Sequence, residues 1–385
     1  MSKSDARILI SSHSPTVTTG YGRVVRRLTH AFRSAGRDVA AAGFGYNGEP
    51  HELPYPVFKL DSYDSPERLS VAVHEFSPDI LLTLSDPWTF KYVPQMAQRK
   101  SFKWIAYFPL DGRPFPADWK PWLENVDVPV VLSKFTQDCV AEATGRTPVL
   151  IYHGVDTQSF RPMDRGQAKE LAHVSGHFVV GCVARNQQRK NLPALVKAFA
   201  QFAADKPDAV LYLHTQVRGH WDLYELVKRF GVEDKTRVTE GLGTDRGVPD
   251  ALLATVYNAM DVFVLPTMGE GFGLPLVESQ ACGTPALATD YSACPELLAD
   301  PIQRLRVKET LIMGHNFEQA VVDTGDIVEK IEYFYRNPVE LRELGERCHR
   351  FAKQFDWSIP CRQFVDLIAS LDAPAQPIET LVKSS

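Results

Sequence analysis

The chain has 385 residues, of which 44% are hydrophobic and 23% charged, and its net charge is −5. This length exceeds one ordinary domain and suits two, and the composition is that of a globular enzyme. Collagen-like, disordered and disulfide-framework classes are excluded, and no run reaches the ~18 apolar residues of a membrane span. The negative charge also argues against nucleic acid as a partner.

The cysteines and the N-terminal segment bear on the cellular compartment. The six cysteines form no C-x-x-C pair and no tight cluster with histidines. This argues against a structural zinc site and fits a reducing cytoplasm. Asp5 and Arg7 stand where a signal peptide would have its apolar segment, so export is not expected. A cytoplasmic location is therefore predicted.

The first part of the chain alternates short apolar runs with helical patterns. Residues 6–14 predict a strand, and residues 21–36 predict a helix with Val24, Leu28 and Phe32 on one face. Further strands are predicted at residues 38–46, 79–86, 102–112, 128–133 and 147–156. Unbroken apolar strands between helices indicate a parallel sheet covered on both faces.

A second series of the same kind follows. Its strands are predicted at residues 178–185, 209–215, 237–241, 261–267 and 284–290. Two series predict an α/β protein with two doubly wound domains, joined by a polar linker around residues 156–170. The expected division is 1–165 for the first domain, 166–355 for the second, and 356–385 for a terminal helix and tail.

A glycine-rich loop after the strand at residues 261–267 carries the first chemical signal. It contains Gly269, Gly271 and Gly273 and leads into a helix expected to start near Pro275. A helix N-terminus behind such a loop offers free N–H groups and a positive dipole end, which together bind anions. Glu270 in the loop and Glu278 on the first helical turn can both face one ligand.

Cations for a diphosphate must come from elsewhere, because residues 251–300 contain no Lys or Arg. Arg185 ends a predicted strand, and Lys190 precedes the next helix. Both are expected at the carboxyl edge of the second sheet, where open α/β folds bind ligands, and both are expected to face solvent. Arg can clamp two phosphate oxygens, and Lys can act as a point charge.

These segments, with HGVDTQSFRP (153–162) and FDWSIPCRQF (355–364), resemble retaining nucleotide-sugar-dependent glycosyltransferases of the GT-B fold, glycosyltransferase family 4. The resemblance covers most of the chain. It implies two Rossmann-like domains facing across a cleft, with the acceptor on the first and the donor on the second. The last helix would cross back to the first domain.

The resemblance also implies roles in the second domain. Glu278 would accept hydrogen bonds from two ribose hydroxyls, and Glu270 would contact the donor sugar. Arg185 and Lys190 would stabilise the leaving diphosphate. Backbone N–H groups that would contact the sugar and phosphate belong to Phe272, Gly273 and Leu274.

In the first domain, the Gly20-Tyr21-Gly22 turn resembles the family's glycine loop, which approaches the diphosphate across the cleft. The family commonly has a His on the strand that corresponds to residues 102–112. This sequence has none there, and Asp111 is the nearest polar candidate to contact the reacting sugar.

The predicted reaction is sugar transfer from a nucleotide diphosphate to a hydroxyl with retention at the anomeric carbon. No cofactor or metal is expected, since no Asp-x-Asp motif accompanies the site. UDP-, GDP- and ADP-sugars are not distinguished, nor are glycan, lipid-linked and small-molecule acceptors. Alternatives are an inverting transferase with His13 as general base, a GT-B sugar-nucleotide epimerase and a catalytically silent binding protein.

Two further expectations concern the surface and domain movement. The polar side of the first helix carries Arg23, Arg26, Arg27, His30 and Arg33. It is either a solvated face or a peripheral contact with an anionic membrane or a phosphorylated acceptor. The domains are expected to close on the donor, with hinges at 153–165 and 355–359.

Overall fold

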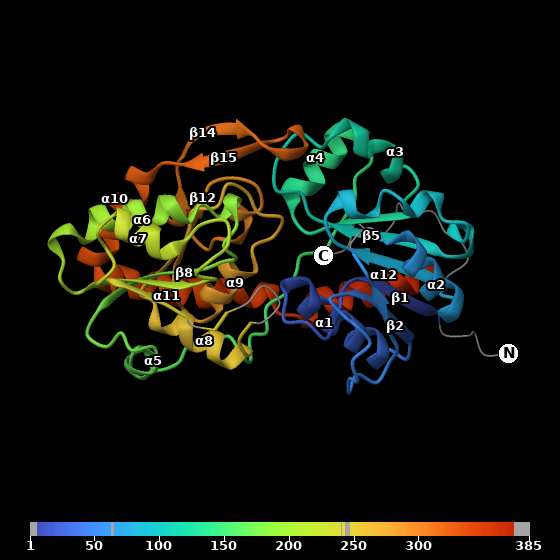
Figure 1. The fold of residues 1–385 in the computed structure, drawn as a ribbon, viewed down its shortest axis with the longest axis horizontal. Coiled ribbons are helices and arrows are strands. Elements are labelled where there is room, and N and C mark those ends of the chain that lie inside the picture. Colours follow the sequence, from blue (N-terminus) through green and yellow to red (C-terminus); the bar gives the residue numbers. More distant parts are fainter. Residues whose placement is uncertain (1–5, 63–64, 240, 243–246, 373–385) are drawn as a thin grey trace.

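The computed structural model describes residues 6–62, 65–239, 241–242 and 247–372. It has two lobes, each built on a parallel sheet with helices on both faces (Figure 1). A two-stranded antiparallel hairpin spans the two lobes on one side. The prediction of two parallel sheets in one chain is confirmed.

The first lobe holds a seven-stranded sheet in the order β3-β2-β1-β4-β5-β6-β7. Its strands are β1 (Arg7–His13), β2 (Asp38–Phe44), β3 (Val57–Leu60), β4 (Ile80–Leu84), β5 (Lys103–Phe108), β6 (Val128–Val131) and β7 (Val149–Leu150). Its helices are α1 (Gly20–Ser34), α2 (Pro66–Phe76), α3 (Lys120–Leu123) and α4 (Lys134–Thr144). The strand order reverses between β1 and β4.

The second lobe holds a six-stranded sheet in the order β10-β9-β8-β11-β12-β13. Its strands are β8 (Phe178–Val183), β9 (Ala209–His214), β10 (Thr236–Val238), β11 (Val262–Leu265), β12 (Ala286–Thr289) and β13 (Arg304–Leu305). The later helices are α5 (Arg165–Leu171), α6 (Leu192–Phe202), α7 (Leu223–Arg229), α8 (Asp250–Ala259), α9 (Leu274–Ala281), α10 (Thr324–Arg336), α11 (Pro338–Ala352) and α12 (Ser358–Asp372). Here the order reverses between β8 and β11.

Buried apolar side chains explain why these segments form the elements predicted. Every residue of β4 is buried, as expected for a central parallel strand. On α1, Val24, Leu28 and Phe32 face the core, and the Thr19 side chain caps the helix by accepting from the Gly22 N–H. Each fully buried side chain of this kind contributes roughly 1.5–3 kcal/mol.

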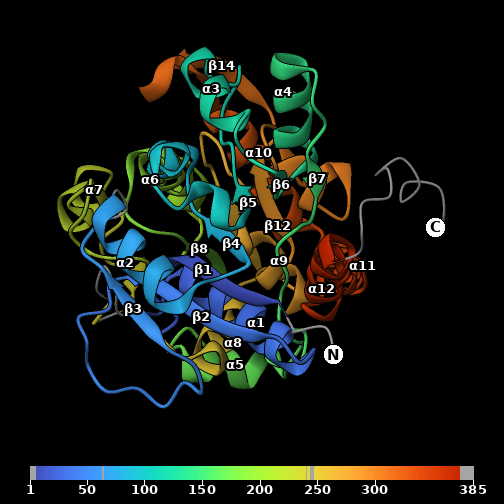
Figure 2. The ribbon, with the colours of Figure 1, turned by 90° about the vertical axis from the view of Figure 1, so that its right-hand side faces the viewer.

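The chain crosses between the lobes at two segments that touch each other. Val155 on the outward segment pairs with Asp356 on the return segment in a parallel bridge. Gly154 lets Trp357 pack tightly here, because a Cβ atom on Gly154 would lie 2.6 Å from the Trp357 ring. Helix α12 then packs beside α1 in the first lobe (Figures 1 and 2).

The sequence analysis did not predict the antiparallel hairpin of β14 (Val307–Ile312) and β15 (Glu318–Val322). Its tip reaches the first lobe, where the backbones of Arg113 and Glu318 exchange two hydrogen bonds. The reason for the omission is that β14 is largely exposed and lacks a continuous apolar run. The hairpin therefore becomes recognisable only from its contacts.

Smaller differences concern strand lengths. The segment predicted as a strand at 147–156 joins the sheet only over Val149–Leu150, and β3 was not predicted. The strand predicted at 237–241 is observed as Thr236–Val238, and residue 240 lies outside the described part, as does the tail from residue 373. Among the described residues, no helix is both long enough and apolar enough to traverse a lipid bilayer.

Candidate active site

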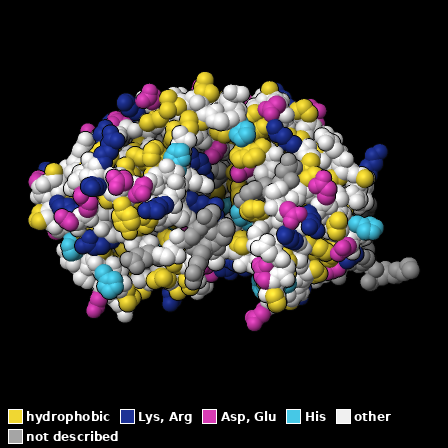
Figure 3. Space-filling model, viewed as in Figure 1, with side chains coloured by type: hydrophobic (Ala, Val, Ile, Leu, Met, Phe, Trp, Pro, Cys, Tyr) yellow, Lys and Arg dark blue, Asp and Glu magenta, His cyan; other side chains and the backbone are white. Residues whose placement is uncertain are grey.

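Two adjoining cavities lie between the lobes, where the space-filling view shows a hollow with Lys and Arg side chains beside it (Figure 3). We call them the inner cavity, of about 550 Å³, and the outer cavity, of about 610 Å³. They share Thr19, Gly20, Ala184, Arg185, Leu274 and Pro275 in their walls. Together, the walls of the two cavities include residues that follow β1, β4, β8 and β11. The strand order reverses between β1 and β4 in one sheet and between β8 and β11 in the other. Folds of this kind bind ligands at such reversal points.

The glycine-rich loop brings the second lobe against the first. A Cβ atom on Gly269 would lie 1.9 Å from the carbonyl oxygen of Asp111, and one on Gly271 would lie 2.2 Å from the Cβ of Pro109. Gly273 precedes α9 with φ +108°, a conformation that favours glycine. Helix α9 begins at Leu274, so its start is close to the prediction and Glu278 lies on the second turn rather than the first.

A buried ionic cluster joins the loops after β8 and β11. Lys190 Nζ contacts Glu270 Oε1, and Arg189 Nη1 lies 3.1 Å from Glu270 Oε2. Arg189 also donates to the carbonyl oxygen of Gly269 at 2.8 Å. Burial alone would raise the pKa of Glu270, but the two cations outweigh it and lower this pKa to about 2. Glu270 is therefore ionised throughout the physiological pH range.

The expectation that Lys190 faces solvent is wrong. Its side chain is buried because its ammonium group is paired with Glu270 inside the protein. Arg185 is partly exposed and lines both cavities, so it is the cation best placed to meet a ligand that spans them. Arg189 was not selected from the sequence, although its position beside Lys190 at the same strand end could have indicated it.

Glu278 is buried and contributes to the wall of the outer cavity. Its Oε2 accepts a hydrogen bond of 2.8 Å from the Tyr257 hydroxyl, and its Oε1 is paired with Arg23 of α1. Arg23 also lies 3.1 Å from Asp250, at the start of α8. An arginine of the first lobe thus links two carboxylates of the second, a contact that the sequence analysis missed.

On the first-lobe side, Gly20, Tyr21 and Gly22 form the first turn of α1 rather than a turn before the helix. Gly20 and Tyr21 line the inner cavity, as the predicted donor contact requires. Gly22 lines neither cavity. It packs against the preceding loop, since a Cβ atom there would lie 2.5 Å from the carbonyl oxygen of Val17. Its role visible in the structure is close packing of the preceding loop.

Two aspartates face the inner cavity from the first lobe. Asp111, predicted from the sequence, lies 3.4 Å from Arg189 Nε, and Asp86, the second residue after β4, accepts a hydrogen bond of 3.4 Å from Tyr21. Burial raises the pKa of both carboxyls, and that of Asp86 reaches about 6 because the Asp111 carboxylate adds to the effect. Asp86 was missed, although it ends a predicted strand at the ligand edge.

His13 and His153 both line the inner cavity. His13 ends β1, and its Nδ1 lies 2.9 Å from the Thr19 hydroxyl. Burial lowers the pKa of His153 to about 3, so this ring is neutral and packs between Tyr107 and Phe272. The part of the chain that the structure describes contains no group of three or more acidic, His or Cys side chains arranged for a metal. The expectation of metal-independent catalysis stays a prediction.

The basic residues of α1 mostly contact the protein itself. Arg27 pairs with Asp156, and Arg26 donates to the carbonyl oxygens of Pro15 and Val17. Contact of this helix with a membrane stays a prediction.

Arg23 provides a test of how the lobes are held together. Arg23→Ala removes both ion pairs that cross from α1 to the second lobe. We expect a larger radius of gyration in small-angle scattering than for the unmodified protein. The control is Arg33→Ala on the same helix, since the contacts of Arg33 with described residues, to Pro54 and to the Tyr55 ring, lie within the first lobe. Equal radii for the two variants would show that the remaining contacts suffice.

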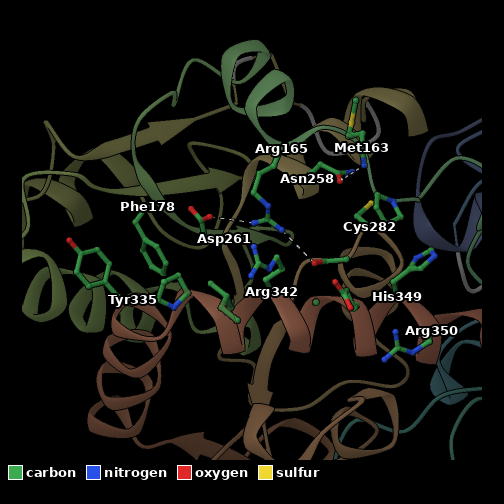
Figure 4. Close-up of a pocket in the computed structure, with 16 residues that line it drawn as sticks. Met163, Arg165, Phe178, Asn258, Asp261, Cys282, Tyr335, Arg342, His349 and Arg350 are labelled. Atoms are coloured by element: carbon green, nitrogen blue, oxygen red, sulfur yellow. Dashed lines mark hydrogen bonds and ion pairs between the residues drawn. The ribbon is translucent and has the colours of Figure 1, made fainter.

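A third cavity, of about 480 Å³, lies away from this cleft, between α5, α8 and α11 (Figure 4). Arg165, one of the cations that line it, already donates hydrogen bonds to Asp261 and to the carbonyl oxygens of Met260 and Gly283. Phe178 and Asp261 place it at the opposite end of the second sheet from the cleft. None of the predicted site residues lines it.

Comparison with known proteins identifies a family domain in the second half of the chain. Residues 164–355 match the family described as Glycosyl transferases group 1. A D-inositol 3-phosphate glycosyltransferase 2 of Catenulispora acidiphila is 30% identical over 224 residues, covering 56% of this chain and 48% of the relative. The chain thus spans about half the length of that relative.

Solved structures match over nearly the whole chain. Sucrose-phosphate synthase of Thermosynechococcus elongatus has a TM-score of 0.79 at 19% identity, covering 95% of this chain and 99% of that one. HepE of Anabaena, in complex with UDP and glucose, has a TM-score of 0.75 at 17% identity, covering 95% and 100%. These likenesses show the predicted GT-B fold. Residues 164–355 therefore form a glycosyl transferases group 1 domain, carried by a chain with the two-domain GT-B fold.

Proposed function

We propose that the protein is a retaining glycosyltransferase that moves a sugar from a nucleotide diphosphate to a hydroxyl acceptor. The observation that carries the proposal is the placement of Arg185, Lys190 and Glu270 with the start of α9 in one cleft between the lobes. Cations and a helix N-terminus suit a diphosphate, and a buried carboxylate suits sugar hydroxyls. The UDP in the HepE structure and the names of the relatives support a nucleotide-sugar donor.

The adjoining cavities suit the two halves of such a donor. The sugar and diphosphate would lie in the inner cavity, and the nucleoside in the outer cavity, beside Glu278. In transfer, the bond from the anomeric carbon to the phosphate oxygen breaks while a bond to the acceptor oxygen forms on the same face. The acceptor's proton passes to the leaving phosphate oxygen. The protein positions both substrates and stabilises charge on the diphosphate.

A thermal-shift screen with UDP-, GDP- and ADP-sugars tests the donor, because a ligand that binds only the native state raises apparent stability. With the donor found, we expect NMR of the product to show the same anomeric configuration as the donor. An inverted product would overturn retention and assign His13, which lines the inner cavity, as general base. Conversion of the donor sugar without acceptor would indicate an epimerase.

The acceptor class and the cellular location need separate evidence. The relatives that resemble this chain are named for different acceptors, among them D-inositol 3-phosphate and the lipopolysaccharide core, the latter for a mannosyltransferase of Rhizobium meliloti. Glycan, lipid-linked and small-molecule acceptors are all compatible with a cleft of this kind. The cytoplasmic location stays a prediction.

A further inference from the structure

The two walls of the inner cavity differ in charge. The second lobe contributes three cations, Arg185, Arg189 and Lys190, and one carboxylate, Glu270, whereas the described first-lobe residues of the wall include no Lys or Arg. They do include two carboxylates, Asp86 and Asp111. A diphosphate therefore fits the second-lobe wall better, because the first-lobe wall offers no cation and two carboxylates, one of which, Asp111, is paired with Arg189.

Part of the first-lobe wall lacks partners within the protein. The Asp86 residue is partly buried, and its carboxylate accepts a long hydrogen bond, of 3.4 Å, from the Tyr21 hydroxyl. The neighbouring Ser85 is 2% exposed, and its hydroxyl has no hydrogen-bond partner among the described residues. Buried polar groups are normally satisfied, so the Ser85 hydroxyl without a partner, next to a carboxylate on the same cavity wall that accepts one long hydrogen bond, indicates a ligand with hydroxyls.

Trp88 adds a rigid apolar surface to the same wall. Its ring lines the inner cavity, and 36% of the residue is exposed. His315, at the tip of the hairpin between β14 and β15, stacks on it with ring centres 4.5 Å apart, and Trp119 packs at 5.6 Å. An indole held in this way can pack on the C–H groups of a sugar ring. An aromatic ring with a few polar groups beside it is a usual composition of a small-molecule binding site.

We propose that Ser85, Asp86 and Trp88 form an acceptor subsite for an uncharged, polyhydroxylated molecule, a neutral sugar or polyol, in preference to its phosphorylated form. The inference rests on the proposed function, since it places the acceptor opposite the donor's diphosphate. Asp86 and Ser85 bind hydroxyls, Trp88 carries the apolar face of the ring, and the two carboxylates exclude a phosphate. The hairpin tip, through His315, keeps the indole in place.

The test measures nucleotide release with matched acceptor pairs: glucose and glucose 6-phosphate, and myo-inositol and its 3-phosphate. Donor binding is first measured by calorimetry without any acceptor. We expect kcat/KM for the neutral member to exceed that for the phosphorylated one by about tenfold or more, the effect of one unfavourable charged contact. Asp86→Asn and Trp88→Ala should each raise KM for the neutral acceptor about tenfold and leave the donor Kd unchanged. Asp86→Asn should also reduce the discrimination against phosphate.

Asp61→Asn is the matched control, because Asp61 is an exposed aspartate of the same lobe that lines neither cavity and pairs with Arg68. It should change neither KM nor discrimination. Preference for the phosphorylated member would overturn the proposal, as would an unaltered KM in both Asp86→Asn and Trp88→Ala. So would normal donor binding with no release stimulated by any member of the panel. If no nucleotide sugar binds at all, the proposed function itself fails, and the acceptor proposal with it.

Discussion

Lys190→Met is expected to reduce sugar transfer strongly and also to destabilise the protein. Loss of one cation beside the leaving diphosphate should lower kcat about 10²–10³-fold, as loss of a preorganised electrostatic contact does elsewhere. Because Lys190 is buried against Glu270, its removal leaves a buried carboxylate with Arg189 as its remaining cation. Breaking a buried pair in this way lowers the free energy of unfolding by at most about 3–5 kcal/mol. The loss is smaller here because Arg189 still pairs with Glu270. Turnover and thermal unfolding measure the two effects.

The double variant Lys190→Met, Glu270→Gln separates stability from catalysis. Replacing both partners removes the unpaired charge, so the melting temperature should recover part of its loss while transfer stays strongly reduced. Arg185→Ala is the comparison at the same edge of the sheet, because Arg185 is partly exposed. It should lose activity with little change in stability. A double variant as unstable as Lys190→Met alone would mean that the destabilisation has another cause.

Glu278→Ala should weaken donor binding about 10–150-fold, since charged hydrogen bonds contribute about 1.5–3 kcal/mol each. Calorimetry with the nucleoside diphosphate alone measures this without the sugar or the acceptor. Unchanged affinity would contradict the assignment of Glu278 to the ribose hydroxyls.

Arg23→Ala is the control that this experiment needs, because Glu278 also holds the two lobes together through Arg23. This variant keeps the carboxylate and its hydrogen bond from Tyr257. If Glu278 binds the ribose, Arg23→Ala should change nucleotide affinity far less than Glu278→Ala. Equal losses would show that Glu278 acts by holding the lobes together.

The parts of the fold that could be predicted are those determined by local patterns. Central strands such as β4 and β9 are mostly apolar and buried at every residue, because both faces of a parallel sheet are covered. The hairpin of β14 and β15 lacks this signal, since it is largely solvent-exposed on β14 and stabilised by contacts with the other lobe. Its position depends on tertiary structure that a one-dimensional pattern does not contain.

The same distinction applies to the site. Arg185 could be selected because it follows a strand at the edge where ligands bind, Glu270 because it lies in a glycine-rich loop before a helix, and Asp111 because the resemblance points to its strand. Arg23 could not, because nothing local distinguishes it from the other arginines on α1, and its role arises from carboxylates on α8 and α9. Burial of Lys190 was also unforeseeable, since it depends on how closely the loop after β11 approaches.

Helix α12 has a consequence for how the protein is made. Phe364 and Ile368 of this helix are fully buried in the same core as Ile8 and Phe32, and Phe364 also packs against Tyr107 of β5. A ribosome delivers the strands of the first lobe long before it delivers α12, and everything in the second lobe emerges in between. The apolar surface of α1 in the nascent first lobe therefore stays exposed until α12 has been synthesised. Newly made chains are most prone to aggregate in this period.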